Sequence, residues 1–245
     1  MPGYDWGLLG LIFVMGALYA SVGHGGASGY LAAMALFGLA PEVMKPAALV
    51  MNVVVAAWVL MRLAGRRNFP WSLFLPIMVP AFPMAFLGGM LHLPAQGYRL
   101  LVGIALLVAA ARFLSERRHP EQSRPPHPWL AMGAGMCLGF LAGLTGVGGG
   151  VYLSPLLLLL GWCTMRDSAA IAAAFILCNS LAGLGGHWLG DGAWPAGMPS
   201  LVLAALGGAV IGAELLVRYL PPHGLRRLLG GVLLIAGGKM LLSGL

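Results

Sequence analysis

The sequence is poor in charged side chains. Acidic and basic residues make up 9% of its 245 positions, whereas soluble domains carry about a quarter. A chain that is also 60% hydrophobic cannot cover itself with a solvated surface, which excludes an ordinary soluble domain. The formal net charge of +7 does not indicate a nucleic-acid-binding protein either, because Lys and Arg occupy short loops and are not gathered into a patch.

Reactive and metal-binding patterns are also lacking. The three cysteines have no C-x-x-C spacing and are interpreted as small buried hydrophobes: Cys137, Cys163 and Cys178. The sequence contains no H-E-x-x-H, H-x-x-x-H or carboxylate cluster, so we expect no metal site and no cofactor. An intramembrane enzyme would need a nucleophile with a base, and Thr145 and His24 are the nearest approximation. We therefore expect no enzyme activity.

What the sequence has in abundance is long apolar runs. A helix of about 20 apolar residues crosses the hydrocarbon core, and the runs are continuous where a barrel strand would alternate. We predict an all-α polytopic membrane protein with about eight full transmembrane helices. Two shorter apolar segments, 28–40 and 150–161, either cross with a tilt or re-enter on their own side. The expected full spans are 6–23, 46–63, 71–92, 98–115, 128–146, 168–188, 199–219 and 225–243.

The two halves of the chain repeat one pattern. Gly23-His24-Gly25-Gly26-Ala27 recurs as Gly146-Val147-Gly148-Gly149-Gly150, at a spacing of 123 (146 − 23). Further on, Asn52 corresponds to Asn179 at a spacing of 127 (179 − 52). A duplicated apolar segment broken by glycine indicates a transporter whose substrate site lies at the interface between the repeats.

Loop charges predict how the halves are oriented. Eleven of the 14 basic residues fall in loops on one side of the expected spans, and Lys45, Arg99 and Lys239 fall on the other. The positive-inside bias makes the first side cytoplasmic and places both termini outside. The first repeat, 1–115, and the second, 128–245, then have inverted topologies and are joined by a cytoplasmic linker, 116–127. Lys45 and Lys239 are expected to snorkel to the outer headgroups.

The glycine motifs themselves suggest an anion site. A run such as 146–150 is unstable inside a helix, because each glycine costs up to about 1 kcal/mol relative to alanine. It forms an unwound connection with a new helix behind it. Two helix N-termini meeting near the midplane would offer free N–H groups and partial positive charge to an anion without any buried Lys or Arg. The spacings Gly139/Gly143 and Gly208/Gly212 are instead interpreted as packing faces.

Several polar side chains accompany these breaks. Asn52 and Asn179 either bind the substrate directly or hold the unwound loops in place. His24 contacts the anion, takes up a proton with it, or packs as a neutral imidazole. Ser28 and Thr145 donate hydroxyls to substrate or to backbone. The predicted substrate-binding set is Gly23, His24, Gly25, Gly26, Ser28, Asn52, Thr145, Gly146, Gly148, Gly149, Gly150, Asn179 and Ser180.

The second motif resembles a known family. Gly-x-Gly-Gly-Gly at 146–150, followed by Pro155 and by Asn179-Ser180, is similar to the TauE/SafE (TSUP) family of sulfite exporters. The duplicated half and basic central loop extend the resemblance over nearly the whole chain. The first copy departs from the pattern, since Ala27 replaces the last glycine and Ala32 stands opposite Pro155. The resemblance implies transport of sulfite, organosulfonates or related sulfur anions across a bacterial inner membrane.

The resulting hypothesis is an exporter of small sulfur-containing anions that works by alternating access at the repeat interface. An anion channel and a proton-coupled importer of thiosulfate, sulfate or a carboxylate stay open as alternatives. Its expected partners are the substrate anion and the lipid bilayer, with no nucleic acid. A homodimer also stays open as a partner, because the sequence does not fix the oligomeric state.

Overall fold

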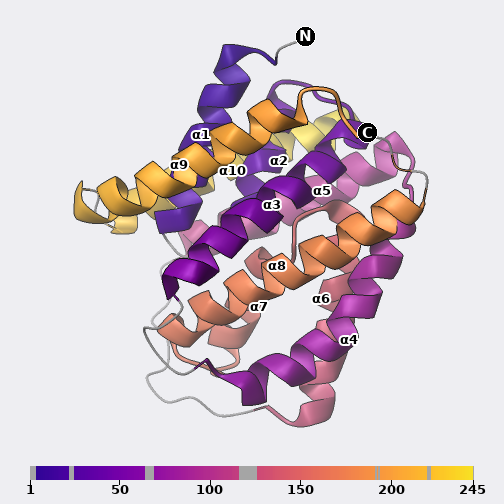
Figure 1. Cartoon of the computed structure of the whole chain (residues 1–245), viewed down its shortest axis with the longest axis vertical. Coiled ribbons are helices and arrows are strands. Elements are labelled where there is room, and N and C mark those ends of the chain that lie inside the picture. The colour runs from indigo at the N-terminus through magenta and orange to yellow at the C-terminus, as the bar shows by residue number, and fades with distance from the viewer. Residues whose placement is uncertain are drawn as a thin grey trace.

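A computed structural model describes residues 4–21, 25–63, 69–115, 126–190, 192, 194–219 and 222–244 of the chain. These residues form ten α-helices and contain no strand, so the all-α prediction is confirmed for this part of the chain (Figure 1). In order, the helices are α1 (Trp6–Ser21), α2 (Ala27–Leu36), α3 (Pro41–Leu63), α4 (Trp71–Met90), α5 (Ala95–Leu114), α6 (Pro128–Thr145), α7 (Gly150–Leu159), α8 (Met165–Leu189), α9 (Met198–Tyr219) and α10 (Pro222–Gly244).

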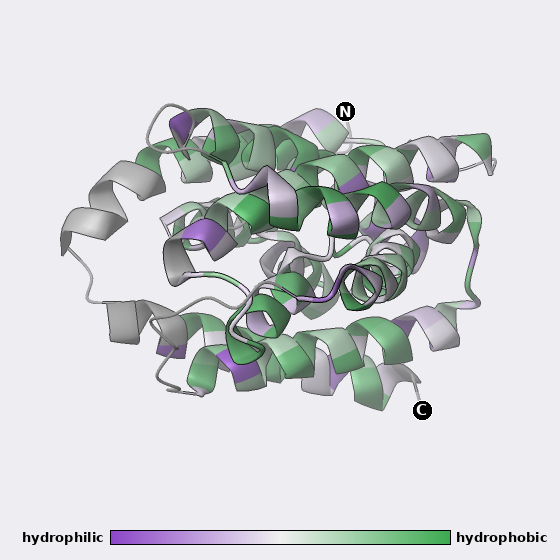
Figure 2. Ribbon diagram, turned by 90° about the horizontal axis from the view of Figure 1, so that it is seen from below, coloured by the Kyte–Doolittle hydropathy of each residue, from purple (hydrophilic) through white to green (hydrophobic). Residues whose placement is uncertain are grey.

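The helices have the length and composition of a polytopic membrane protein. Within the described residues, five helices contain a stretch long and apolar enough to cross a bilayer: α3, α4, α5, α6 and α8. Helices α1, α2, α7 and the Met198–Ile211 part of α9 are shorter apolar helices, so the expected count of eight full spans stays a prediction. Apolar residues are distributed along the whole length of the helices (Figure 2). Large hydrophobic side chains such as Val79, Leu203 and Ile235 are exposed, as contact with lipid requires.

Glycine lets two helix pairs approach closely. On α6, Gly139 and Gly143 lie directly against the backbone of Ala81 and Ala85 in α4. On α9, Gly208 lies in the same way against the backbone of Phe13 in α1. Packing without a hydrophobic driving force depends on such close contacts. The packing role predicted for Gly139, Gly143 and Gly208 is confirmed, and the surroundings of Gly212 lie outside the described side chains.

The tight α4–α6 contact makes a direct prediction for stability. A Cβ at Gly143 would collide with the Ala85 carbonyl oxygen, so we expect Gly143→Ala to destabilise the protein by about 1–3 kcal/mol. Gly133 lies on the same helix with nothing within 4 Å of an added Cβ. Gly133→Ala should therefore be neutral or stabilising by up to about 1 kcal/mol. Thermal unfolding in detergent measures both, and equal melting temperatures would contradict the packing role.

The remaining contacts pair the helices in a regular way. Helix α3 packs along α8, and α5 packs along α10. Helix α4 packs on α6 and α8, whereas α9 packs on α1 and α3. In Figure 1, α3 therefore lies between α8 and α9. The short helices α2 and α7 contact α3 and α8 respectively, so each begins beside one of the two central helices.

The two lysines expected at the outer headgroups differ in the structure, and the expectation is wrong for Lys45. Lys45 does not snorkel to the lipid surface: its side chain is 5% exposed, and its Nζ donates to the carbonyls of Gly89 (2.8 Å), Leu91 (2.9 Å) and Gly88 (3.3 Å) at the end of α4. Lys239 is exposed, but its Nζ donates to the carbonyl of Leu36 at the end of α2 (2.6 Å). Both lysines thus satisfy the last carbonyls of a helix, which the negative end of the helix dipole favours.

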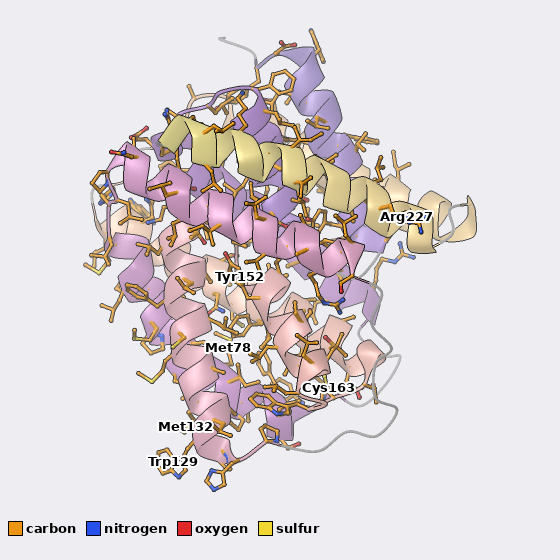
Figure 3. The ribbon with its side chains drawn as sticks, turned by 180° about the vertical axis from the view of Figure 1, so that it is seen from behind. Met78, Trp129, Met132, Tyr152, Cys163 and Arg227 are labelled. Carbon is orange, nitrogen blue, oxygen red and sulfur yellow. The ribbon has the colours of Figure 1, made fainter. Side chains whose placement is uncertain are left out.

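The cysteines are only partly buried. Cys163 is buried in the connection after α7 (Figure 3), in the same core cluster as Met78, and burial raises the pKa of its thiol to about 12. Cys137 is exposed on α6 and Cys178 is half-buried, so the expectation that all three are buried is wrong. A helix that faces lipid tolerates an exposed thiol because the surrounding solvent is apolar.

Candidate substrate site

The two expected breaks are present as turns before short helices. Helix α6 ends at Thr145, and Gly146, Gly148 and Gly149 follow with φ of 79°, 73° and 78° before α7 begins at Gly150. In the first half, Gly26 has φ of 89° immediately before α2. Only glycine adopts this left-handed conformation without strain. Gly23 and His24 lie outside the described residues, so the structure says nothing of the proton-binding role considered for His24.

Both turns place a helix N-terminus in the interior. Residues 25–30 and 142–150 are all buried. Gly26 and Gly149 occupy the N-cap positions, and neither provides a side-chain cap for its helix. Tyr152, on the first turn of α7, lies near the middle of the molecule, far from Trp129 at the start of α6 (Figure 3). The starts of α2 and α7 therefore present backbone N–H groups away from bulk solvent.

The turns converge on the two central helices. A Cβ placed on Gly148 would lie 2.8 Å from Asn52 Nδ2, 3.1 Å from Ser180 Oγ and 3.1 Å from Ile176 Cγ2. A Cβ placed on Gly25 would lie 2.8 Å from the same Ile176 atom and 3.5 Å from Asn52 Oδ1. Glycines from opposite halves of the chain thus border the same asparagine and isoleucine. Glycine at these positions allows the backbone to approach the amide closely.

The polar side chains at this point have no hydrogen-bond partner among the residues that the structure describes. Asn52 on α3 and Asn179 and Ser180 on α8 are each 0% exposed. Within the described part of the chain, neither amide nor the Ser180 hydroxyl has a protein partner. An unsatisfied buried polar group costs about 1–3 kcal/mol, so native structures rarely retain several of them. Such a cluster is what a site for a polar ligand requires.

Not every predicted residue borders this cluster. Asn179 precedes Ser180 on α8, but its amide is not among the nearest atoms around the described glycines of either turn. Gly146 faces the backbone of Lys45 (3.0 Å from its carbonyl oxygen to an added Cβ), and Gly149 faces Phe175. Gly150 lies directly against Ile176. Gly146 and Gly149 therefore shape the turn, while Gly25, Gly148 and Gly150 border the cluster.

The two predicted hydroxyls are engaged by the protein. Ser28 Oγ lies 2.6 Å from the Tyr19 hydroxyl. Thr145 Oγ1 donates to the Leu141 carbonyl (2.6 Å) and accepts from the Val147 N–H (3.3 Å). The backbone alternative considered for Thr145 is thus the one observed. Both residues hold the ends of the turns in position.

Sequence reasoning missed two residues of the site, Tyr30 and Ile176. The Tyr30 side chain is 0% exposed and its hydroxyl has no partner among the described residues. A Cβ on Gly26 would lie 2.6 Å from Tyr30 Oη, so the phenol folds back over the start of its own helix. Helical side chains lean toward the N-terminus, so the spacing Gly26 to Tyr30 carried this signal. Ile176 is apolar and carried none.

The electrostatics of the cluster are those of neutral donors. The side chains that border Gly25, Gly26 and Gly148 are asparagine, serine, tyrosine and isoleucine, and none is ionised at neutral pH. Among the described residues no group of three or more His, Cys, Asp or Glu could hold a metal ion. Amide N–H, hydroxyl and helix N-terminal groups all donate hydrogen bonds, and they stabilise negative charge by dipoles alone.

Comparison with known proteins agrees with a membrane transporter. The family model described as Sulfite exporter TauE/SafE matches residues 8–240. The chain is 38% identical over 242 residues to a protein of Sinorhizobium fredii named probable membrane transporter protein y4hK, covering 96% of this chain and 97% of that protein. No solved structure matches the chain.

Proposed function

The chain belongs to the TauE/SafE family of membrane transporters, which are not enzymes, and on that premise we propose that it exports small sulfur oxyanions or organosulfonates across the bacterial inner membrane. The observation that carries the proposal is a set of buried polar side chains at the two turns, Asn52 and Ser180 beside Gly148 and Tyr30 beside Gly26, whose polar atoms have no partner among the described residues. The anion sits between the starts of α2 and α7, and these donors replace part of its hydration.

Alternating access is the mechanism that this arrangement supports. Under the proposed inverted repeats, 1–115 and 128–245, the counterparts are α3 with α8, α5 with α10, α4 with α9 and α1 with α6. Helices α3 and α8 pack together, as do α5 and α10, while α4 packs on α6 and α9 on α1. A two-fold relation between the halves produces this set of pairs. Both termini would then be extracytoplasmic.

The burial of the cluster favours a carrier over an open channel. Asn52, Asn179 and Ser180 have no exposed surface, which supports an occluded arrangement over a permanently open path. An inside-negative potential drives an anion outward with about 2.3 kcal/mol per charge per 100 mV. Export therefore needs no coupling ion, whereas uptake would need one.

Binding and counterflow test the proposal. We expect sulfite or a short organosulfonate to raise the melting temperature of the purified protein, by an amount equivalent to about 2.7 kcal/mol at 100-fold excess over Kd. In liposomes preloaded with that anion, labelled anion outside should accumulate transiently, because a carrier exchanges the two. A screen of sulfite, sulfate, thiosulfate and taurine in which no anion stabilises the protein would contradict the binding site. Flux without trans-stimulation would indicate a channel.

Removing one oxygen tests the part assigned to Tyr30. Tyr30→Phe should weaken anion binding about 10- to 100-fold, because a hydrogen bond to a charged group contributes about 1.5–3 kcal/mol. Tyr19→Phe is the matched control, since the Tyr19 hydroxyl is bonded to Ser28. That change should lower stability by about 1 kcal/mol and leave affinity unchanged. Calorimetric titration measures both, and an unchanged affinity in Tyr30→Phe would remove the tyrosine from the site.

A further inference from the structure

A cavity separate from the central cluster lies where the first turn of α3 meets the ends of α4 and α8. Its volume is about 270 Å³, and Glu42, Lys45, His92, Tyr98, Leu144 and His187 are among the residues that line it. These residues come from α3, the α4–α5 connection, α5, α6 and α8. The loop-charge bias predicts that this end of the molecule is extracytoplasmic.

Two imidazoles meet in this cavity. The rings of His92 and His187 are 5.8 Å apart between centroids and inclined by 43°. His187 is 6% exposed at the end of α8, whereas His92 is exposed in the segment after α4. Histidine supplies at least one N–H donor in its neutral form and two when it is protonated. The pair therefore places donors on both the buried and the accessible wall.

The fixed charges of the cavity differ in how strongly water screens them. Lys45 is buried with its three N–H groups directed at the carbonyls of Gly88, Gly89 and Leu91, so its charge is held next to the cavity wall. Glu42 is exposed, and its negative charge is screened by solvent. A buried charge acts over its surroundings more strongly than an exposed one. The lining thus favours a negative ligand.

The cavity shares a wall with the central site. Leu144 lines it, and the Tyr98 hydroxyl donates to the carbonyl of Thr145 (2.9 Å). Gly146 then packs against the backbone of Lys45, two residues before Gly148 borders the buried cluster. The segment 144–146 therefore separates the cavity from the central site, and an anion that passes between them has to pass this segment.

We propose that this cavity is a second anion-binding site, an outer vestibule that holds a small oxyanion beside Lys45, His92 and His187. Its volume suits a sulfonate with a short substituent. Only its place on the transport path rests on the proposed function, because binding in the vestibule does not require transport. Protonation of an imidazole adds positive charge next to the anion and strengthens binding. The ionisable groups facing them are Glu42 and Lys45 of α3 and Tyr98 of α5, and Asp191 lies outside the described residues.

Protection of a cysteine tests the vestibule directly. Leu91 lines the cavity and is exposed, so Leu91→Cys introduces a thiol there. We expect an impermeant maleimide added outside to label it in proteoliposomes, and methanesulfonate to slow the labelling relative to chloride.

His187→Gln should raise the methanesulfonate concentration needed for protection about tenfold or more, as loss of a hydrogen bond to an anion does. Glu42→Gln should lower the methanesulfonate concentration needed for protection. A lower buffer pH should lower it too, once the slower reaction of the thiol at that pH is corrected for. The parent protein, labelled in parallel, accounts for Cys137.

The outcomes separate the vestibule from the central site. In the Asn52→Leu background, protection should persist although transport is lost. If protection disappears with Asn52→Leu, or is the same in His187→Gln, the anion acts from elsewhere and the vestibule is overturned. If protection follows the histidines but no anion is transported by the parent protein, the vestibule stands and the proposed transport fails.

Discussion

Replacement of Asn52 or Asn179 by leucine should make the protein more resistant to heat, and Asn52→Leu should also lower transport. Both amides are fully buried and have no partner among the described residues, and each unsatisfied group costs about 1–3 kcal/mol in the empty protein. Leucine has the same number and branching of side-chain heavy atoms and removes this cost. Both variants should melt at a higher temperature, and in Asn52→Leu the anion also loses a charge-assisted hydrogen bond, so transport should fall by at least about tenfold.

Thr164→Ala supplies the opposite pattern. Thr164 caps α8, where its Oγ1 donates to Asp167 Oδ2 (2.7 Å) and accepts from the Asp167 N–H (3.3 Å). Its loss should cost about 1 kcal/mol of stability and leave transport intact. Liposome flux and thermal unfolding measure all three variants. Leucine variants that melt early yet still transport would show that the asparagines hold the loops in place, the alternative that the sequence left open.

Gly148→Ala should damage both the fold and the substrate site. It forces a side chain into φ of 73°, at a cost of about 1–2 kcal/mol. It also puts the Cβ 2.8 Å from Asn52 Nδ2 and 3.1 Å from Ser180 Oγ, where the anion would bind. We expect loss of anion binding together with lower stability, measured by calorimetric titration and thermal unfolding.

Gly38→Ala separates the two effects. Gly38 has φ of 74°, but an added Cβ would meet nothing within 4 Å. This variant should therefore show the backbone strain alone, with a similar loss of stability and unchanged affinity. Equal affinities in Gly148→Ala and Gly38→Ala would mean that Gly148 does not border the bound anion.

The apolar pattern predicted the helices well, but the predicted start of several helices is too late in the sequence. Helix α3 begins at Pro41, where the apolar run predicted residue 46, and α5 and α8 each begin three residues before the predicted start. The first turns are polar, so hydropathy excludes them. In α3 that turn carries Glu42 and Lys45. Lys45 is tolerated because the carbonyls at the end of α4 accept hydrogen bonds from its ammonium group. That compensation depends on a contact about 45 residues away along the chain, which no local pattern reveals.

The site was predictable where backbone geometry dictated the residue. Gly26, Gly146, Gly148 and Gly149 adopt a conformation that only glycine enters freely, so their clustering was visible in the sequence. The partners of polar side chains were not visible. Ser28 and Thr145 resemble Ser180 in the sequence, yet Tyr19 and the α6 backbone engage the first two, and no described residue engages the third. Such a difference arises only from tertiary packing.

Under the proposed function, the uncharged side chains described in the central cluster would also determine which half of a transport cycle responds to voltage. Among the described residues, Asn52, Ser180, Tyr30 and Ile176 bring no fixed charge to the proposed site. A carrier of this kind is electrically silent when it returns empty and moves charge only when it is loaded. The membrane potential would then accelerate departure of the anion and leave the return step untouched, so at high voltage the turnover rate would become limited by the reorientation of the empty protein.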